Sequence, residues 1–111
     1  LSSNRVLDLA GRTTVLQSLA VLQRGEICLC ADTGILHLAY GVGTPTVSLF
    51  GPGNYRKWVP PEGPHVTVRK DLPCSPCTRL GHTPSCSHNI TCMERITVED
   101  VTGAIERVIE W

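Results

Sequence analysis

A chain of 111 residues is long enough to bury one hydrophobic core but short for two, so it suits a single domain. Its 10 basic residues balance its 10 acidic residues, whereas nucleic-acid-binding domains usually carry a basic surplus or stripe. No apolar run approaches the roughly 18 residues of a membrane span. Composition therefore argues against nucleic-acid partners and against a transmembrane segment.

The patterns at both ends favour a cut within a longer protein. Residues 1–5 show neither an initiator Met nor a signal-peptide pattern. Residues 108–111 stop within or just after a helical pattern. We therefore expect residues 1–111 to be a fragment that forms one domain.

The first quarter of the chain predicts a strand and a helix. Residues 5–9 alternate briefly between apolar and polar and predict a short strand. Apolar residues then recur at helical spacing over about 15–24, after a capping Thr13 or Thr14. Gly25 follows a basic last turn and is a typical helix stop.

The middle of the chain alternates strands with a helix. Residues 27–31 are a continuous apolar run, typical of a strand buried on both faces, and 46–50 predict a second such strand. Residues 35–42 predict a short helix between them, and 51–54 must be a loop. Residues 65–69 predict a further, more exposed strand.

The last third predicts a long loop and a final helix. Residues from about 73 to 93 contain too much Cys, Pro, Ser, Gly and His for a regular element. Thr97 then begins a helix, because Thr97 and Asp100 approximate a capping box. Strands that alternate with helices predict an α/β fold with a Rossmann-like parallel sheet and flanking helices.

The turn after the first buried strand is the most specialised one. Ligands of open α/β sheets bind beyond the carboxyl ends of the strands, where Asp32, Thr33, Gly34 and His37 stand. The amides of Thr33, Gly34 and the next residue would favour a diphosphate. Asp32 suits sugar hydroxyls rather than phosphate, and His37, one turn into the helix, could donate to either group. The alternative is that Asp32 caps the helix and that His37 only packs on its face.

Several motifs in order resemble glycosyltransferase family 9, the ADP-heptose:lipopolysaccharide heptosyltransferases. The resemblance covers nearly the whole chain and rests on the segments 8–13, 32–39, 43–47, 49–52, 74–77, 92–93 and 96–101. It implies a GT-B architecture, in which two Rossmann-like domains face each other across a cleft. Residues 1–111 are similar to the C-terminal, donor-binding domain.

The resemblance implies roles for the same turn. Asp32 would hold heptose hydroxyls, while His37 and the backbone amides of Thr33 and Gly34 would hold the diphosphate of ADP-heptose. The transfer would invert the anomeric carbon and need no metal. The catalytic base of the family lies in the N-terminal domain, so we expect no catalytic residue here and no transfer by this fragment alone.

The resemblance also implies partners and a location. The acceptor would be the lipid A-linked inner core of lipopolysaccharide, which meets the missing N-terminal domain. The parent enzyme would then be cytoplasmic and peripheral to the inner face of the bacterial inner membrane. The turn at residues 9–11 could touch the adenine, although an ordinary strand-to-helix turn is an equal alternative.

Four of the six cysteines crowd into nineteen residues, at Cys74, Cys77, Cys86 and Cys92. A Cys-x-x-Cys pair with two further ligands could hold a structural zinc ion or an iron–sulfur centre, but these spacings match no standard finger. Free thiols or a disulfide are the preferred alternative. Cys28 and Cys30 lie in an apolar run and suit small core positions.

Two other functions remain open at this stage. A non-catalytic metal-binding or interaction module built on the four clustered cysteines would bind metal and have no affinity for nucleotides. A relative of the heptosyltransferases that uses another nucleotide sugar would share every motif noted above.

Overall fold

The computed structural model describes residues 4–111 and shows a three-stranded parallel sheet between helices. The strands are β1 (Cys28–Ala31), β2 (Thr46–Leu49) and β3 (His65–Val68), in the order β1-β2-β3. The start of the chain, where the sequence lacks a signal-peptide pattern, falls partly on residues 1–3, outside the described residues. The α/β class and the parallel pairing predicted from the sequence are confirmed.

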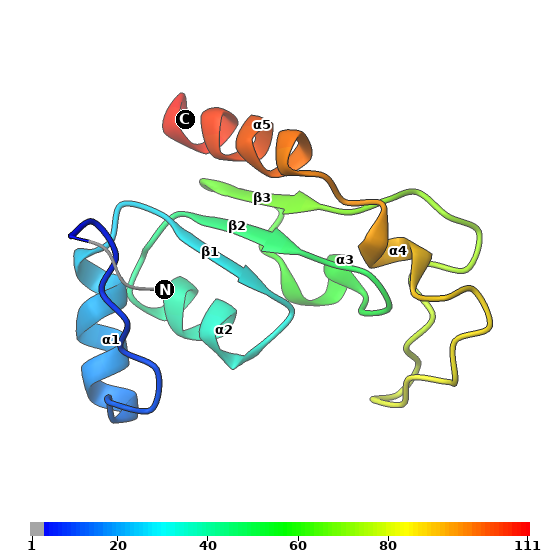
Figure 1. Cartoon of the computed structure of the whole chain (residues 1–111), viewed down its shortest axis with the longest axis horizontal. Coiled ribbons are helices and arrows are strands. Elements are labelled where there is room, and N and C mark those ends of the chain that lie inside the picture. Colours follow the sequence, from blue (N-terminus) through cyan, green and yellow to red (C-terminus); the bar gives the residue numbers. More distant parts are fainter. Residues whose placement is uncertain (1–3) are drawn as a thin grey trace.

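Two helices cover opposite faces of the sheet (Figure 1). Helix α2 (Gly34–Gly41) packs on β1 and β2, and helix α5 (Val98–Ile109) packs on β3 and β2. Buried residues from the sheet and from α5 form the main core cluster, namely Val47, Val68, Ala104 and Val108. On the other side, Leu36 and Ala39 of α2 are fully buried.

Side-chain caps explain where the longer helices begin. Helix α1 (Val15–Arg24) starts after a capping box in which the Thr14 side chain accepts from the Gln17 amide, and it stops at Gly25. Helix α5 starts after the same arrangement at Thr97 and Asp100. Both boundaries agree with the sequence predictions. The apolar stripe of α1 packs less than expected, because no residue of α1 is fully buried.

Two predicted strands need correction. Residues 5–9 form no strand beyond an isolated bridge at Val6, and Val6 and Leu7 are 45% and 76% exposed, so little burial favours an extended segment here. Strand β1 is buried on one face only. Its Leu29 is 51% exposed because α5 lies over β3 and β2, so the apolar face of β1 stays open beside Leu49 and Ile105.

Two short helices occur where the sequence predicted loops. Helix α3 (Tyr55–Trp58) is capped by the Asn54 side chain, which accepts from the Arg56 amide. Helix α4 (Thr91–Glu94) ends the cysteine-rich segment, which otherwise contains no regular element, as predicted. This segment extends from the sheet beyond the carboxyl ends of the strands (Figure 1).

Candidate functional site

A cleft of about 490 Å³ opens at the carboxyl end of β1, where the sequence placed the site. Its walls come from three places in the chain: the tip of β1, the loop after β2 with α3, and the cysteine-rich segment. The lining residues are Asp32, Gly53, Asn54, Lys57, Trp58, Thr78, Arg79, Leu80 and Gly81. Of the four predicted site residues, Asp32 lines this cleft directly.

The Asp32 carboxylate lies against the backbone of Gly53. A Cβ atom added at Gly53 would overlap Asp32 Oδ2 and come within 3.2 Å of Asp32 Cγ. Gly53 is itself buried, so the backbone has little room to move away. The loop after β2 therefore lies directly against the carboxylate, and a side chain at position 53 would displace it.

Helix α2 presents its N-terminus without a side-chain cap. Thr33 is the N-cap residue, and within residues 4–111 no side chain bonds the first amides of the helix. The alternative in which Asp32 caps α2 is therefore wrong. A Cβ atom at Gly34 would meet nothing within 4 Å, so open space lies above the first turn. Free amides facing open space can receive an anionic group.

His37 lies on the exposed side of α2, beside the cleft-lining Trp58. The two ring centroids are 5.3 Å apart in an edge-to-face arrangement. A second edge-to-face contact joins His37 to Tyr40, at 6.1 Å. These contacts orient the imidazole through ring packing. His37 thus contacts Trp58, which lines the same cleft as Asp32, while His37 itself does not line it.

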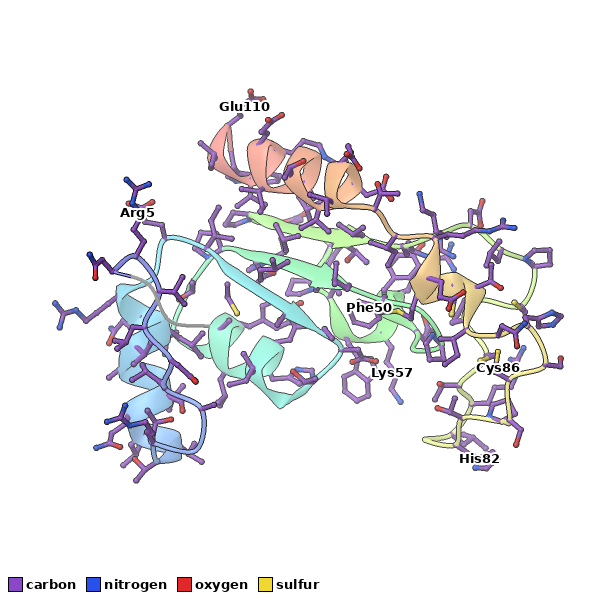
Figure 2. The ribbon with its side chains drawn as sticks, viewed as in Figure 1. Arg5, Phe50, Lys57, His82, Cys86 and Glu110 are labelled. Carbon is purple, nitrogen blue, oxygen red and sulfur yellow. The ribbon has the colours of Figure 1, made fainter. Side chains whose placement is uncertain are left out.

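Two cations of the cleft were missed by the sequence analysis. Lys57 belongs to α3, and its Nζ lies 4.8 Å from the centre of the Trp58 ring (Figure 2). Arg79 lies in the cysteine-rich segment, where it exchanges two backbone hydrogen bonds of 2.9 Å with His82. Both come from segments read as irregular. The one available signal was Asn54, a good N-cap immediately before Tyr55-Arg56-Lys57-Trp58.

The turn at residues 9–11, which was considered for adenine contacts, is held by hydrogen bonds among residues 8–12. The Arg12 amide donates to the Leu9 carbonyl at 3.0 Å, and the Ala10 amide donates to Asp8 Oδ1 at 3.0 Å. None of these residues lines the cleft. This arrangement favours the alternative of an ordinary turn.

The four clustered cysteines line a second cavity, of about 220 Å³. Burial raises the pKa of the Cys92 thiol, and the charges of Cys86, Cys74 and Cys77 raise it further. All six cysteines of the chain are free thiols. Cys28 is buried in the core as predicted, and burial together with Cys28 raises the pKa of the half-buried Cys30 to about 12.

Comparisons with known proteins identify the family of the chain. Among residues 4–111, no helix is both long and apolar enough to cross a membrane. No solved structure matches the chain. A curated relative, "Lipopolysaccharide heptosyltransferase 1" of Pseudomonas aeruginosa, is 37% identical over 73 residues, which are 66% of this chain and 19% of the relative. The chain thus spans about a fifth of the length of that relative.

The sequence model of "Glycosyltransferase family 9 (heptosyltransferase)" matches residues 1–88. This range includes all three strands, Asp32 and the loop after β2 that contacts Asp32. The identity to a named heptosyltransferase covers a large part of the chain as well. The chain therefore belongs to glycosyltransferase family 9, the heptosyltransferase family.

Proposed function

We propose that this chain is the C-terminal donor-binding domain, residues 1–111, of a GT-B heptosyltransferase that uses ADP-heptose. The observation that carries the proposal is the cleft at the tip of β1, where one carboxylate and two cations line the same cavity as the Trp58 ring. Membership of glycosyltransferase family 9 supports a nucleotide-sugar donor.

The two kinds of charge suit the two halves of such a donor. The Asp32 carboxylate accepts hydrogen bonds from sugar hydroxyls and would repel phosphate at the same position. Lys57 and Arg79 donate to phosphate oxygens, together with His37 and the free amides of Thr33 and Gly34. The heptose therefore lies at Asp32, and the diphosphate lies between the start of α2 and the two cations.

In the transfer, an acceptor hydroxyl attacks the anomeric carbon as the bond from that carbon to the diphosphate oxygen breaks. The amides, His37 and the cations stabilise the negative charge that develops on the leaving diphosphate. The acceptor proton goes to a base in the other domain of the parent enzyme, so the catalytic residue lies outside this chain. This route inverts the anomeric carbon and uses no metal ion.

The relative's name supports an acceptor in lipopolysaccharide, which we take to be the lipid A-linked inner core. An enzyme with this acceptor works in the cytoplasm at the inner face of the inner membrane. Another nucleotide sugar remains the second candidate, because residues 9–11, the turn considered for contact with the base, do not line the cleft.

Titration calorimetry with ADP and ADP-heptose tests the proposal. Asp32→Ala should weaken ADP-heptose at least tenfold and ADP by much less, because only the sugar contacts the carboxylate. Asp71→Ala removes a carboxylate that is 98% exposed and serves as the control. Equal losses for both ligands would show that Asp32 does not bind the sugar.

A second variant tests the close approach of the diphosphate to α2. Gly34→Ala adds a methyl group that no protein atom opposes, so the fold should be unchanged while both ADP and ADP-heptose bind more weakly. Gly41→Ala, at the far end of the same helix, also meets no atom within 4 Å and should leave binding intact. Wild-type affinity in Gly34→Ala would place the diphosphate elsewhere.

A further inference from the structure

The cavity formed by the cysteine-rich segment lies outside the donor cleft and has a different chemistry. Its lining brings together four thiols that are spread over nineteen residues of sequence: Cys74, Cys77, Cys86 and Cys92. His88 also reaches the lining, whereas no Asp or Glu does. A lining rich in thiols and free of carboxylates suits a borderline-soft metal ion.

Two backbone hydrogen bonds hold the sulfur of Cys86 in place. Its Sγ accepts a hydrogen bond from the His88 amide at 3.4 Å and another from the Ile90 amide at 3.3 Å. The turn that aims both amides at one sulfur places Asn89 and Ile90 in the left-handed region, at φ 53° and 56°. Residues other than glycine rarely adopt this backbone conformation. Backbone N–H groups that donate to a ligand sulfur fix its orientation.

The other three cysteines are held near one another by the loop after β2. Ser75 Oγ donates to the Gly51 carbonyl at 2.6 Å, and the Cys77 amide donates to the Pro52 carbonyl at 2.9 Å. Cys92 belongs to α4 and lies beside Gly51, where an added Cβ atom would come within 2.9 Å of its Sγ. Two separate segments thus contact the same loop, and all four cysteines line one cavity.

We propose that Cys74, Cys77, Cys86 and Cys92 bind one zinc ion with a structural role. Tetrahedral zinc is held by four thiolates at about 2.3 Å. Each thiol releases its proton to solvent as its sulfur binds, and no atom changes oxidation state. The inference does not depend on which donor the cleft binds.

Binding requires the segment to close around the ion. Within residues 4–111, no three side chains of His, Cys, Asp or Glu already form a metal-binding group. Residues 79–90 are all exposed, so little packing opposes an inward movement of Cys86 (Figure 2). The ion would tie this segment to the loop after β2, and thereby fix Thr78 to Gly81, which line the donor cleft.

Metal analysis of the full chain, purified without chelators, is the first test. We expect one zinc per chain and no acid-labile sulfide. Iron with sulfide would overturn the assignment, and so would metal-free protein that does not take up added Zn²⁺ after reduction of its thiols. Loss of two or four hydrogens in the intact mass would identify disulfides instead.

Variants test the ligand set. Cys86→Ser should lower the zinc content at least tenfold, whereas His88→Ala should retain one zinc, because His88 lines the cavity but is not a proposed ligand. Loss of zinc in His88→Ala with retention in Cys86→Ser would overturn the four-cysteine set. Co²⁺ added to the wild-type chain gives a check that needs no variant, since four thiolates produce sulfur-to-cobalt charge transfer and tetrahedral ligand-field bands.

Hydrogen exchange tests the structural role. Removal of zinc by a chelator should speed exchange at the amides of Cys77 and Thr78 at least tenfold, because both donate to the Pro52 carbonyl. Amides of β2 should keep their protection. Unchanged exchange at residues 77 and 78 after complete removal of the ion would show that zinc does not hold this wall.

Discussion

The sheet and the cysteine-rich segment, residues 73–93, are held in place by different interactions. Fully buried side chains fix the sheet between its helices, among them Val47, Leu36 and Phe50. In the segment, by contrast, residues 79–90 are all exposed, and attachment to the sheet depends on a few hydrogen bonds to Gly51 and Pro52. The cleft at the tip of β1 lies at the boundary between them. One wall is therefore set by hydrophobic burial and the other by local polar contacts.

Truncation of one large apolar side chain in each region should give the largest difference in the free energy of unfolding. Phe50 is 1% exposed, so Phe50→Ala should lower the free energy of unfolding by about 3–5 kcal/mol. Leu80 is fully exposed, and Leu80→Ala should change it by less than about 0.5 kcal/mol. Urea denaturation measures both. Similar losses would mean that the segment packs as a core does.

Gly53 lies where the two regions meet, and Gly53→Ala should displace the Asp32 carboxylate. The added methyl group overlaps Asp32 Oδ2, but the exposed Asp32 side chain can rotate away, so stability should change by less than about 1 kcal/mol. Affinity for ADP-heptose should fall at least tenfold in calorimetry, even for the fraction that remains folded. Unchanged affinity would mean that the carboxylate can leave its position and still bind the sugar.

The cap at Thr97 decides where the segment ends and α5 begins. Thr97→Ala removes the oxygen that accepts from the Asp100 amide at 3.1 Å and should cost about 1 kcal/mol in urea denaturation. Thr97→Ser keeps the hydroxyl and should cost much less. Equal losses in the two variants would point to the methyl group rather than to the cap.

The smallest effect concerns pH. Burial lowers the pKa of His65 in β3 below its usual 6.5, so the unfolded chain binds this proton more readily than the folded one. The free energy of unfolding should therefore keep its full value above pH 6.5 and should decrease as the pH drops below that value. His65→Gln should flatten the pH dependence of the urea midpoint between pH 7 and pH 5. An unchanged slope would assign the effect to another group.

The sequence predicted the elements whose signals are local. Thr14, Gly25 and Thr97 marked helix ends that the structure confirms, because caps depend on neighbours within a few residues. Strand burial was harder to predict, since the exposure of Leu29 depends on which strands α5 covers. The apolar pattern of β1 carries no information about that choice.

The residues of the candidate site also fall into those with a local sequence signal and those without one. Asp32, Thr33, Gly34 and His37 were found because they follow one strand in sequence, and the structure puts Asp32 in the cleft. Lys57 and Arg79 reach it from segments that are distant in sequence, so no spacing could reveal them.

The carbonyl of Pro52 accepts from two successive amides, those of Cys77 and Thr78, both at 2.9 Å. This attachment joins the buried sheet to a wall in which residues 79–90 are all exposed. Insertions, deletions or exchanges between Arg79 and Ser85 could therefore reshape the cleft while the sheet stays intact. The segment is an exchangeable part, through which engineering could alter donor preference without rebuilding the domain.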